Sequence, residues 1–408
     1  MYRVPSMTRD AARRAGAFGV AALVGLTAAG GRVSAQSSAT PASARSPSSW
    51  EWTLDTSLFL QFNYQQRKFT DFWAVESPNW LMGSGRRLFG AGTLEIAAMV
   101  SLEAFTLDDI GSPQVFQTGE TFEGGPLIDY QHPHDLVMQL GAQYDRLARG
   151  VRFGGTASIV GAPAFGPRAF MHRASADANP TAPLAHHHLD SMHITPGVLT
   201  ATAGARGAAV EASVFRGREP DEDRLDLDLG ALDSWAVRGS WTRGRWSAQV
   251  SGASVTSPEA LEPGVDVTRL SASLGFDQTT AVGGLSALAA WGQMRDVYGT
   301  TDAYLVEGAW HPSAALTWYG RVESVVKNIL TAGGQHPPGF THAHEFSRVG
   351  ALTLGVRRAL VRARGLDILA GGDVTGHRTS PSLQESYGRP WSYHVYVQLR
   401  RTGPHRHR

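Results

Sequence analysis

The sequence has no cysteine among its 408 residues, so neither a disulfide nor a thiolate metal site is available to stabilise the fold. After the first 36 residues it has no apolar run of about 18 residues, which argues against a membrane-spanning helix there. Charged residues make up only 18% of the chain and the net charge is +1, which argues against a nucleic-acid partner. Strand pairing must therefore hold the fold together.

The N-terminus is typical of a secretory signal peptide. Basic residues from Arg3 to Arg14 precede an apolar stretch from Ala15 to about Ala29, and Val33-Ser34-Ala35 forms a small-residue cleavage site. We therefore expect a signal peptide over 1–35, a flexible Ser/Ala/Pro-rich leader over 36–50, the folded domain over 51–401 and a basic, histidine-containing tail over 402–408.

Alternating polarity is the strongest pattern in the remaining chain. From Thr53 to Tyr64 the even positions are almost all apolar and the odd positions almost all polar. Because side chains alternate across a strand, one face of this segment meets an apolar medium and the other meets water. Gly (46 residues), Trp (11) and Tyr (10) are spread along the chain, and Trp and Tyr suit the two interfacial girdles of an outer-membrane barrel.

Similar segments of about ten residues recur and predict about sixteen strands. They are 53–66, 77–87, 93–105, 134–145, 151–161, 193–203, 207–216, 233–242, 245–255, 265–276, 285–295, 301–311, 315–327, 344–357, 365–375 and 391–400. Short links alternate with long ones (67–76, 106–133, 162–192, 217–232, 256–264, 328–343 and 376–390), with 296–300 as the short exception. This alternation predicts an all-β transmembrane antiparallel barrel with short periplasmic turns and long extracellular loops, in a Gram-negative outer membrane.

The strand phases also predict which charged residues face the lumen, since charge on the lipid face costs a few kcal/mol near the bilayer midplane. The expected lumen-lining residues are Asp55, Glu95, Glu103, Glu307, Arg321 and Glu323. Their mixed sign fits either a polar channel wall or charges that only pair with one another across the wall.

Eleven of the fifteen histidines fall in or beside the long loops, the densest group being His186 to His193. Imidazole is a common ligand of Zn and Cu, so this placement indicates a candidate metal site at the extracellular mouth. The expected ligands are His132, His134, His186, His187, Asp190 and His193, with Met171 and His172 as further contributors. Two alternatives remain open: a hydrogen-bonded network that holds a folded lid, and solvated loop tips.

These features favour a porin-like channel or narrow transporter for a small solute or metal ion, with the proline-stiffened 162–192 loop as a His-rich lid. The alternative is a plugged surface barrel that binds metal or acts in adhesion. A hydrolase is disfavoured, because Ser191 and His193 are poorly spaced for a catalytic pair and no Gly-x-Ser-x-Gly elbow is present.

Several loop motifs resemble those of an uncharacterised family of bacterial outer-membrane proteins. They are Gln117–Thr121, Pro126–Asp135, Ala169–Arg173, Asn179–His187, Asp190, His193–Thr195, Gly217–Glu222 and Ser257–Gly264. The resemblance covers nearly all of the mature chain and implies a barrel, but no activity. It departs at His188, where the family has an aromatic residue. The expected partners are outer-membrane lipid, lipopolysaccharide and the barrel-assembly machinery, and the chain is either a monomer or a trimer.

Overall fold

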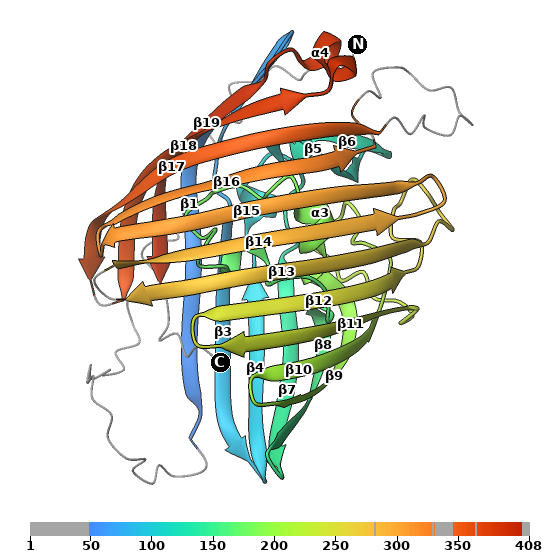
Figure 1. Ribbon diagram of the computed structural model, residues 1–408, viewed down its shortest axis with the longest axis vertical. Helices are drawn as coiled ribbons and strands as arrows, with labels where there is room; N and C mark the ends of the chain where they lie inside the picture. Colours follow the sequence, from blue (N-terminus) through green and yellow to red (C-terminus); the bar gives the residue numbers. More distant parts are fainter. Residues whose placement is uncertain (1–48, 281–282, 329, 331–345, 364, 402–408) are drawn as a thin grey trace. The chain divides into compact units, whose positions relative to one another are not determined.

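The computed structural model describes residues 49–280, 283–328, 330, 346–363 and 365–401 (Figure 1). The expected signal peptide, nearly all of the leader and the C-terminal tail lie outside the described residues. So does most of the 328–343 loop, together with His336, His342 and His344.

In the described part of the chain, seventeen strands form one antiparallel sheet. They are β1 (Glu51–Arg67), β2 (Thr70–Glu76), β3 (Asn79–Phe89), β4 (Gly92–Val100), β7 (Val137–Ala148), β8 (Val151–Gly161), β9 (Thr195–Ala205), β10 (Ala208–Phe215), β11 (Ser234–Arg243), β12 (Trp246–Val255), β13 (Val267–Thr280), β14 (Gly283–Arg295), β15 (Thr300–Ser313), β16 (Leu316–Lys327), β17 (Ser347–Ala363), β18 (Leu366–Thr379) and β19 (Trp391–Arg401). A separate hairpin comprises β5 (Ser112–Phe122) and β6 (Gly125–Gln131).

The large sheet closes on itself, because β1 pairs with β19 on one side and with β2 and β3 on the other. Strands β2 and β3 follow one another along the same edge of β1 and are interrupted at Ser77 and Pro78. A proline has no backbone N–H to donate to a ladder, which accounts for the break. The two segments therefore share one position, and the predicted closed barrel of sixteen strands is confirmed.

The two faces of the wall have opposite chemistry. On β1, Phe62 and Tyr64 lie on the outer face, whereas Gln61, Asn63 and Gln65 are buried inside. Exposed tryptophans mark both ends of the outer face, with Trp241 and Trp318 at the end of the short turns and Trp73 and Trp235 at the opposite end, which carries the long loops. They correspond to the two aromatic girdles expected at the membrane interfaces.

Two expectations about the loops were wrong. The segment 67–76 is not a long link, because β1 and β2 continue as a hairpin to a turn at Lys68 and Phe69. The strand expected over 93–105 ends at Val100, because the Ser101 hydroxyl accepts the Glu103 N–H at 3.0 Å and begins a short helix. Glu103 is therefore a loop residue rather than part of the strand wall.

The other loops contain short helices. These are α2 (Glu103–Thr106), the 3-10 helix η1 (Phe170–His172), α3 (His186–Leu189), the 3-10 helix η2 (Ser191–Ile194) and α4 (Pro381–Tyr387). Among the described residues, none of these helices has the length and apolar character needed to cross a bilayer.

The loop between β8 and β9, residues 162–194, folds inward and is called here the inserted loop (Figure 1). Its backbone bonds to inward-pointing side chains of the wall: Arg321 donates to the Thr181 carbonyl at 3.0 Å, and Tyr396 donates to the Ala178 carbonyl at 2.7 Å. Near the mouth, Leu184 and Leu189 share an apolar core with Leu305 and other inner-wall residues of β14–β17. Part of the lumen is therefore filled by packed protein.

Candidate functional site

A cavity of about 50 Å³ lies where the inserted loop meets the loops before β7 and after β10. Five histidines line it, namely His132, His134, His186, His187 and His193. Successive ring centroids are 6.3 Å apart for His132 and His134, 5.5 Å for His134 and His193, 5.3 Å for His193 and His186, and 5.7 Å for His186 and His187. The structure thus brings together imidazoles that lie about sixty residues apart in the sequence.

Four of these rings are held through the same nitrogen. The Nδ1 atom donates to the Pro133 carbonyl from His132, to the Glu103 carboxylate from His134, to the Asp190 carboxylate from His186 and to the Asp190 carbonyl from His193, at 2.7–2.9 Å. Each acceptor is an oxygen without a proton of its own, so Nδ1 must carry the hydrogen and Nε2 keeps a lone pair when the ring is neutral. Metal-ligating histidines are commonly held in this way.

Asp190 orients this group from behind rather than lining the cavity. One of its carboxylate oxygens accepts from His186 and the other from Arg173. Arg173 continues to Glu307 on β15, with Nε 2.7 Å from Oε1. The Arg173 guanidinium and His186 outweigh the effect of burial and hold the pKa of Asp190 at about 2, so this carboxylate stays charged at neutral pH.

Glu120 joins the cavity through His132, whose Nε2 lies 2.9 Å from Glu120 Oε1. Burial raises the pKa of Glu120 to about 7, and burial with the nearby Arg224 lowers that of His132 to about 3. Because Nδ1 of His132 already carries the ring proton, Glu120 in its neutral form donates to Nε2. A cation at Nε2 would have to displace this proton.

Burial also lowers the pKa values of His187 and His193 well below the usual value, assisted for both by neighbouring His186. Their Nε2 atoms find no hydrogen-bond partner within the part of the chain that the structure describes. Burial acts in the same sense on His134, but the Glu103 carboxylate outweighs it and raises its pKa. At neutral pH the cavity therefore presents an unprotonated Nε2 atom of His193 and a neutral His187 ring.

The imidazole donors do not form a closed coordination sphere. Tetrahedral ligands at zinc distances lie roughly 3.4 Å from one another. Among the described residues, the one group of three donors from histidine or carboxylate side chains that all lie within 4.8 Å is Asp221, Asp226 and Asp228, on the loop after β10. A metal ion at the histidines would have to draw their rings together.

The two further expected contributors, Met171 and His172, do not line the cavity. His172 packs against Trp80 with ring centroids 4.6 Å apart, and Met171 belongs to an apolar cluster on the side of β4 and β7. His188 binds the Thr301 hydroxyl on β15 at 2.9 Å. Ser191 does line the cavity, where its hydroxyl accepts from Arg269 and donates to the His187 carbonyl.

The expected lumen charges Glu307, Arg321 and Glu323 are buried on β15 and β16, whereas Asp55 and Glu95 are half-buried on β1 and β4. Sequence reasoning missed several charged residues that line the cavity, namely Glu120, Glu219, Arg216, Arg218, Arg224 and Arg269. Four of them, Glu120, Glu219, Arg216 and Arg218, lie within or beside the motifs Gln117–Thr121 and Gly217–Glu222, and this was the available signal. Arg269 lies on β13, and its local sequence does not distinguish it from inward-facing charges that are far from the cavity.

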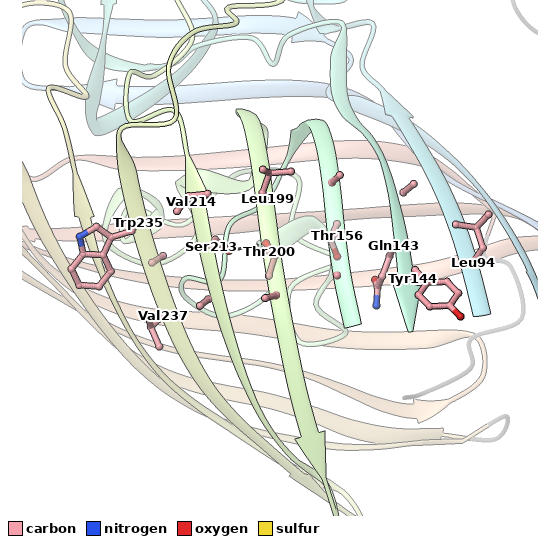
Figure 2. Close-up of a pocket in the computed structure, with 16 residues that line it drawn as sticks. Leu94, Gln143, Tyr144, Thr156, Leu199, Thr200, Ser213, Val214, Trp235 and Val237 are labelled. Carbon is pink, nitrogen blue, oxygen red and sulfur yellow. Dashed lines mark hydrogen bonds between the residues drawn. The ribbon is translucent and has the colours of Figure 1, made fainter. Parts of the chain in front are cut away.

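A larger hollow of about 790 Å³ lies on the outer wall across β4 and β7–β11. Figure 2 shows Leu94, Leu199, Trp235 and Val237 around it, and the last three are exposed on the outer face. Small residues form its floor, namely Ala142, Gly155, Ala157, Ala201 and Ala212. The hollow is apolar and contains no histidine, so it belongs to the membrane-facing surface rather than to the histidine cavity.

No family model matches the sequence, and no curated protein matches it significantly. Among solved structures, the anion-selective porin from Comamonas acidovorans is similar with a TM-score of 0.50 and 11% identity, covering 86% of this chain and 100% of that chain. OmpF of Salmonella typhi, solved as a complex with daunomycin, has a TM-score of 0.50 and 9% identity, covering 86% and 97%. At such identities the likeness shows the fold alone, which is that of an outer-membrane porin.

Proposed function

We propose that this protein is a narrow outer-membrane channel whose inserted loop acts as a lid, and that the histidine cavity at its mouth binds a transition metal ion, Cu or Zn. The observation that carries the metal assignment is the shared Nδ1 anchoring of His132, His134, His186 and His193. It supports Nε2 lone pairs that are already oriented, which is what neutral imidazole ligation requires.

Calorimetry on the refolded full-length protein tests the metal site. Zn²⁺ and Cu²⁺ are titrated into the wild type, into His187→Ala plus His193→Ala, and into the control His311→Ala, whose ring binds Thr317 at the turn end. We expect the double variant to lose a binding event that the control retains. Equal heats in wild type and double variant would leave the cavity as a structural network only.

The channel assignment rests on the unequal filling of the lumen. Inward side chains in the middle of β8–β11, such as Thr156, Thr200 and Arg238, remain half-exposed, whereas inward side chains of β15–β17 are covered along most of their length. Planar-bilayer recording of the refolded protein tests it: single-channel steps are expected for the wild type, with a larger conductance after removal of 170–190. Silence in both proteins would favour the plugged surface barrel instead.

One observation favours a second candidate, an oxyanion site in the same cavity. Arg216 Nη1 and Arg269 Nε are buried donors with no hydrogen-bond partner in the described ranges, and Arg218 and Arg224 also line the cavity. Phosphate titrated in the same calorimeter separates the candidates. The oxyanion site would replace the metal site if phosphate binding releases or absorbs heat in the wild type but not in Arg216→Gln, and if Zn²⁺ and Cu²⁺ give no heat.

The proposal also includes the outer membrane as the location of the protein. Apolar outer positions and two tryptophan girdles support insertion in a Gram-negative outer membrane after removal of residues 1–35, with lipopolysaccharide and the barrel-assembly machinery as partners. N-terminal sequencing of protein purified from outer-membrane fractions tests the cleavage site. A mature protein that still begins at Met1 would contradict it.

A further inference from the structure

A second group of buried polar side chains lies inside the barrel where β19, β1 and β2 run side by side. In the strand register, Gln61 pairs with Glu76 of β2, and Asn63 of β1 pairs with His394 of β19. Gln61, Glu76 and His394 are 1%, 4% and 3% exposed, and none of them lines the histidine cavity. This group is therefore a separate feature of the inner wall.

One atom of each side chain has no hydrogen-bond partner among the described residues, namely Gln61 Oε1, Glu76 Oε2 and His394 Nε2. The other polar side-chain atoms of Gln61 and Glu76 have hydrogen-bond partners. Glu76 Oε1 accepts from Gln61 Nε2 at 2.8 Å, from Asn63 Nδ2 at 2.9 Å and from Ser112 Oγ at 2.7 Å. Because Gln61 Nε2 is the donor to this carboxylate, the free atom of its amide is the oxygen.

The His394 ring is fixed in the same manner. Its Nδ1 donates to Asp373 Oδ1 on β18 at 2.7 Å, and Tyr319 donates to the other oxygen of Asp373 at 2.8 Å. The two ring nitrogens lie on opposite sides of an imidazole, so Nε2 faces away from β18, toward β1. Glu76 lies on that side and interacts electrostatically with His394.

When Glu76 is ionised all three free atoms are acceptors and cannot satisfy one another, whereas a protonated Glu76 would donate from Oε2. A buried acceptor without a partner costs roughly 1–3 kcal/mol. A cation would satisfy all three at once, and an imidazole nitrogen with a carboxylate oxygen and an amide oxygen is a ligand set for a borderline transition metal ion. The Asp373–His394 pair supplies the carboxylate that typically orients a metal-bound histidine.

We infer that Gln61 Oε1, Glu76 Oε2 and His394 Nε2 form an inner binding site for one divalent transition metal ion of the Zn²⁺ or Co²⁺ class. The site lies beneath the inserted loop, since Tyr396, two residues beyond His394 on β19, donates to the Ala178 carbonyl. It does not depend on metal binding at the mouth. An internal water molecule bridging the three acceptors is the competing occupant.

The test uses the refolded full-length protein with His187→Ala and His193→Ala, so that the cavity at the mouth does not contribute. Equilibrium dialysis against Co²⁺ gives the stoichiometry, and the visible absorption of bound Co²⁺ reports its ligands. We expect about one ion per chain, lost when Glu76→Gln or His394→Gln is added. Asp373→Asn should weaken binding about 10- to 100-fold, because it orients His394 without touching the metal.

Gln249 provides a matched control, since it is also a buried inner-wall glutamine with an unpartnered Oε1 but binds only Ser271 through its amide nitrogen. Gln61→Leu should weaken Co²⁺ binding and Gln249→Leu should not. Heat-modifiable gel mobility checks that each variant is folded, and if Glu76→Gln is not folded, His394→Gln decides alone.

Two outcomes would overturn the inference. One is a background variant that binds no Co²⁺, and the other is Co²⁺ binding that persists unchanged in folded Glu76→Gln and His394→Gln. Either result would assign a water molecule to the three acceptors. Failure of the mouth site is distinguishable, because the background variant and the wild type would then bind the same number of ions.

Discussion

The two sides of the barrel's inner wall differ in how they meet the inserted loop. On β15–β17, Glu307, Arg321, Thr353 and Arg357 are buried, and three of these four bond to that loop directly. On β8–β11 the inward residues nearest the mouth, such as Ser213 and Phe215, are also buried, whereas those farther from it, such as Thr156 and Glu211, are half-exposed. The same alternating pattern thus produces a packed core on one side and a wetted surface on the other.

This difference shows that an inward polar residue of a barrel strand has two distinct fates. Under the loop it behaves like a residue of a protein core, where an unpaired charge is costly. Beside the remaining space it behaves like a surface residue, where an ion pair contributes little. Each of the following predictions contrasts these two environments.

The largest effect should follow from removing the inserted loop. Replacing 170–190 by a short Gly-Ser linker removes the groups that cover β15–β17, so single-channel conductance should rise several-fold. Replacing 225–229, in the exposed loop after β10, by a linker of the same kind is the control and should leave conductance nearly unchanged. Equal conductance in the two deletions would show that the loop does not narrow the path.

The second largest effect should follow from breaking the buried ion pair between Arg173 of the inserted loop and Glu307 of the wall. Arg173→Met strands the carboxylates of Asp190 and Glu307, and removing one partner of a buried pair typically costs about 3–5 kcal/mol. Arg238→Met removes the half-exposed pair with Glu211 on the opposite wall and one hydrogen bond to the Gly166 carbonyl of the loop, and should cost less, about 1–2 kcal/mol. Hydrogen exchange of the loop amides measures both.

The comparison between the two walls would be wrong if the two arginine variants changed loop opening equally. A further check is Arg173→Met combined with Glu307→Gln, which removes one of the stranded charges. This double variant should recover part of the loss, because only Asp190 then lacks its partner guanidinium.

Acid should loosen the inserted loop at the histidine cavity. The pKa of His132 is lowered to about 3 and those of His187 and His193 well below 6.5, mainly by burial, so protons bind the unfolded loop first. Their stabilising contribution is complete above pH 6.5 and is lost as the pH falls toward the folded values. Protonation of Glu120 in the folded state opposes this loss of stability between about pH 7 and 4.5. The loss of stability should therefore be steepest between about pH 4.5 and 3.

Protease cleavage of the inserted loop at pH 7.5 and pH 4 measures this loosening. His187→Gln plus His193→Gln should reduce the pH dependence, because two of the groups that take up protons on opening are then absent. An unchanged pH dependence in the double variant would assign the effect to other groups.

The smallest predicted effect concerns Glu120. Burial raises its pKa to about 7 from an unfolded value of 4.5, so the folded state holds the proton more tightly. That contribution is complete below pH 4.5 and is lost as the pH rises through 7. Between pH 5.5 and 8.5 the histidines make the loop harder to open and Glu120 opposes them, so the wild-type loop should gain less protection from hydrogen exchange than the Glu120→Gln loop. A parallel change in both proteins would contradict a neutral Glu120 carboxyl.

The sequence was sufficient to predict the wall because each strand carries its own evidence. The period of two in 53–64 sets which face of β1 meets lipid, and the alternation of short and long links sets which end carries the loops. The break in the strand at Ser77 and Pro78 was not predicted. Trp73 and Val75, the apolar outward residues of β2, were assigned to a loop instead.

The sequence by itself determined the closed barrel and predicted three of its inward charges, Glu307, Arg321 and Glu323. It did not single out other inner-wall charges such as Arg357 and Asp373. Only the tertiary structure decided that Leu305 and Val325 would pack inside the mouth against Phe116 and Leu184. It also decided that Glu103 would hold His134. Strand polarity is a local property of successive residues, whereas a buried contact such as Arg173 with Glu307 joins residues 134 positions apart and depends on how a whole loop fills the lumen.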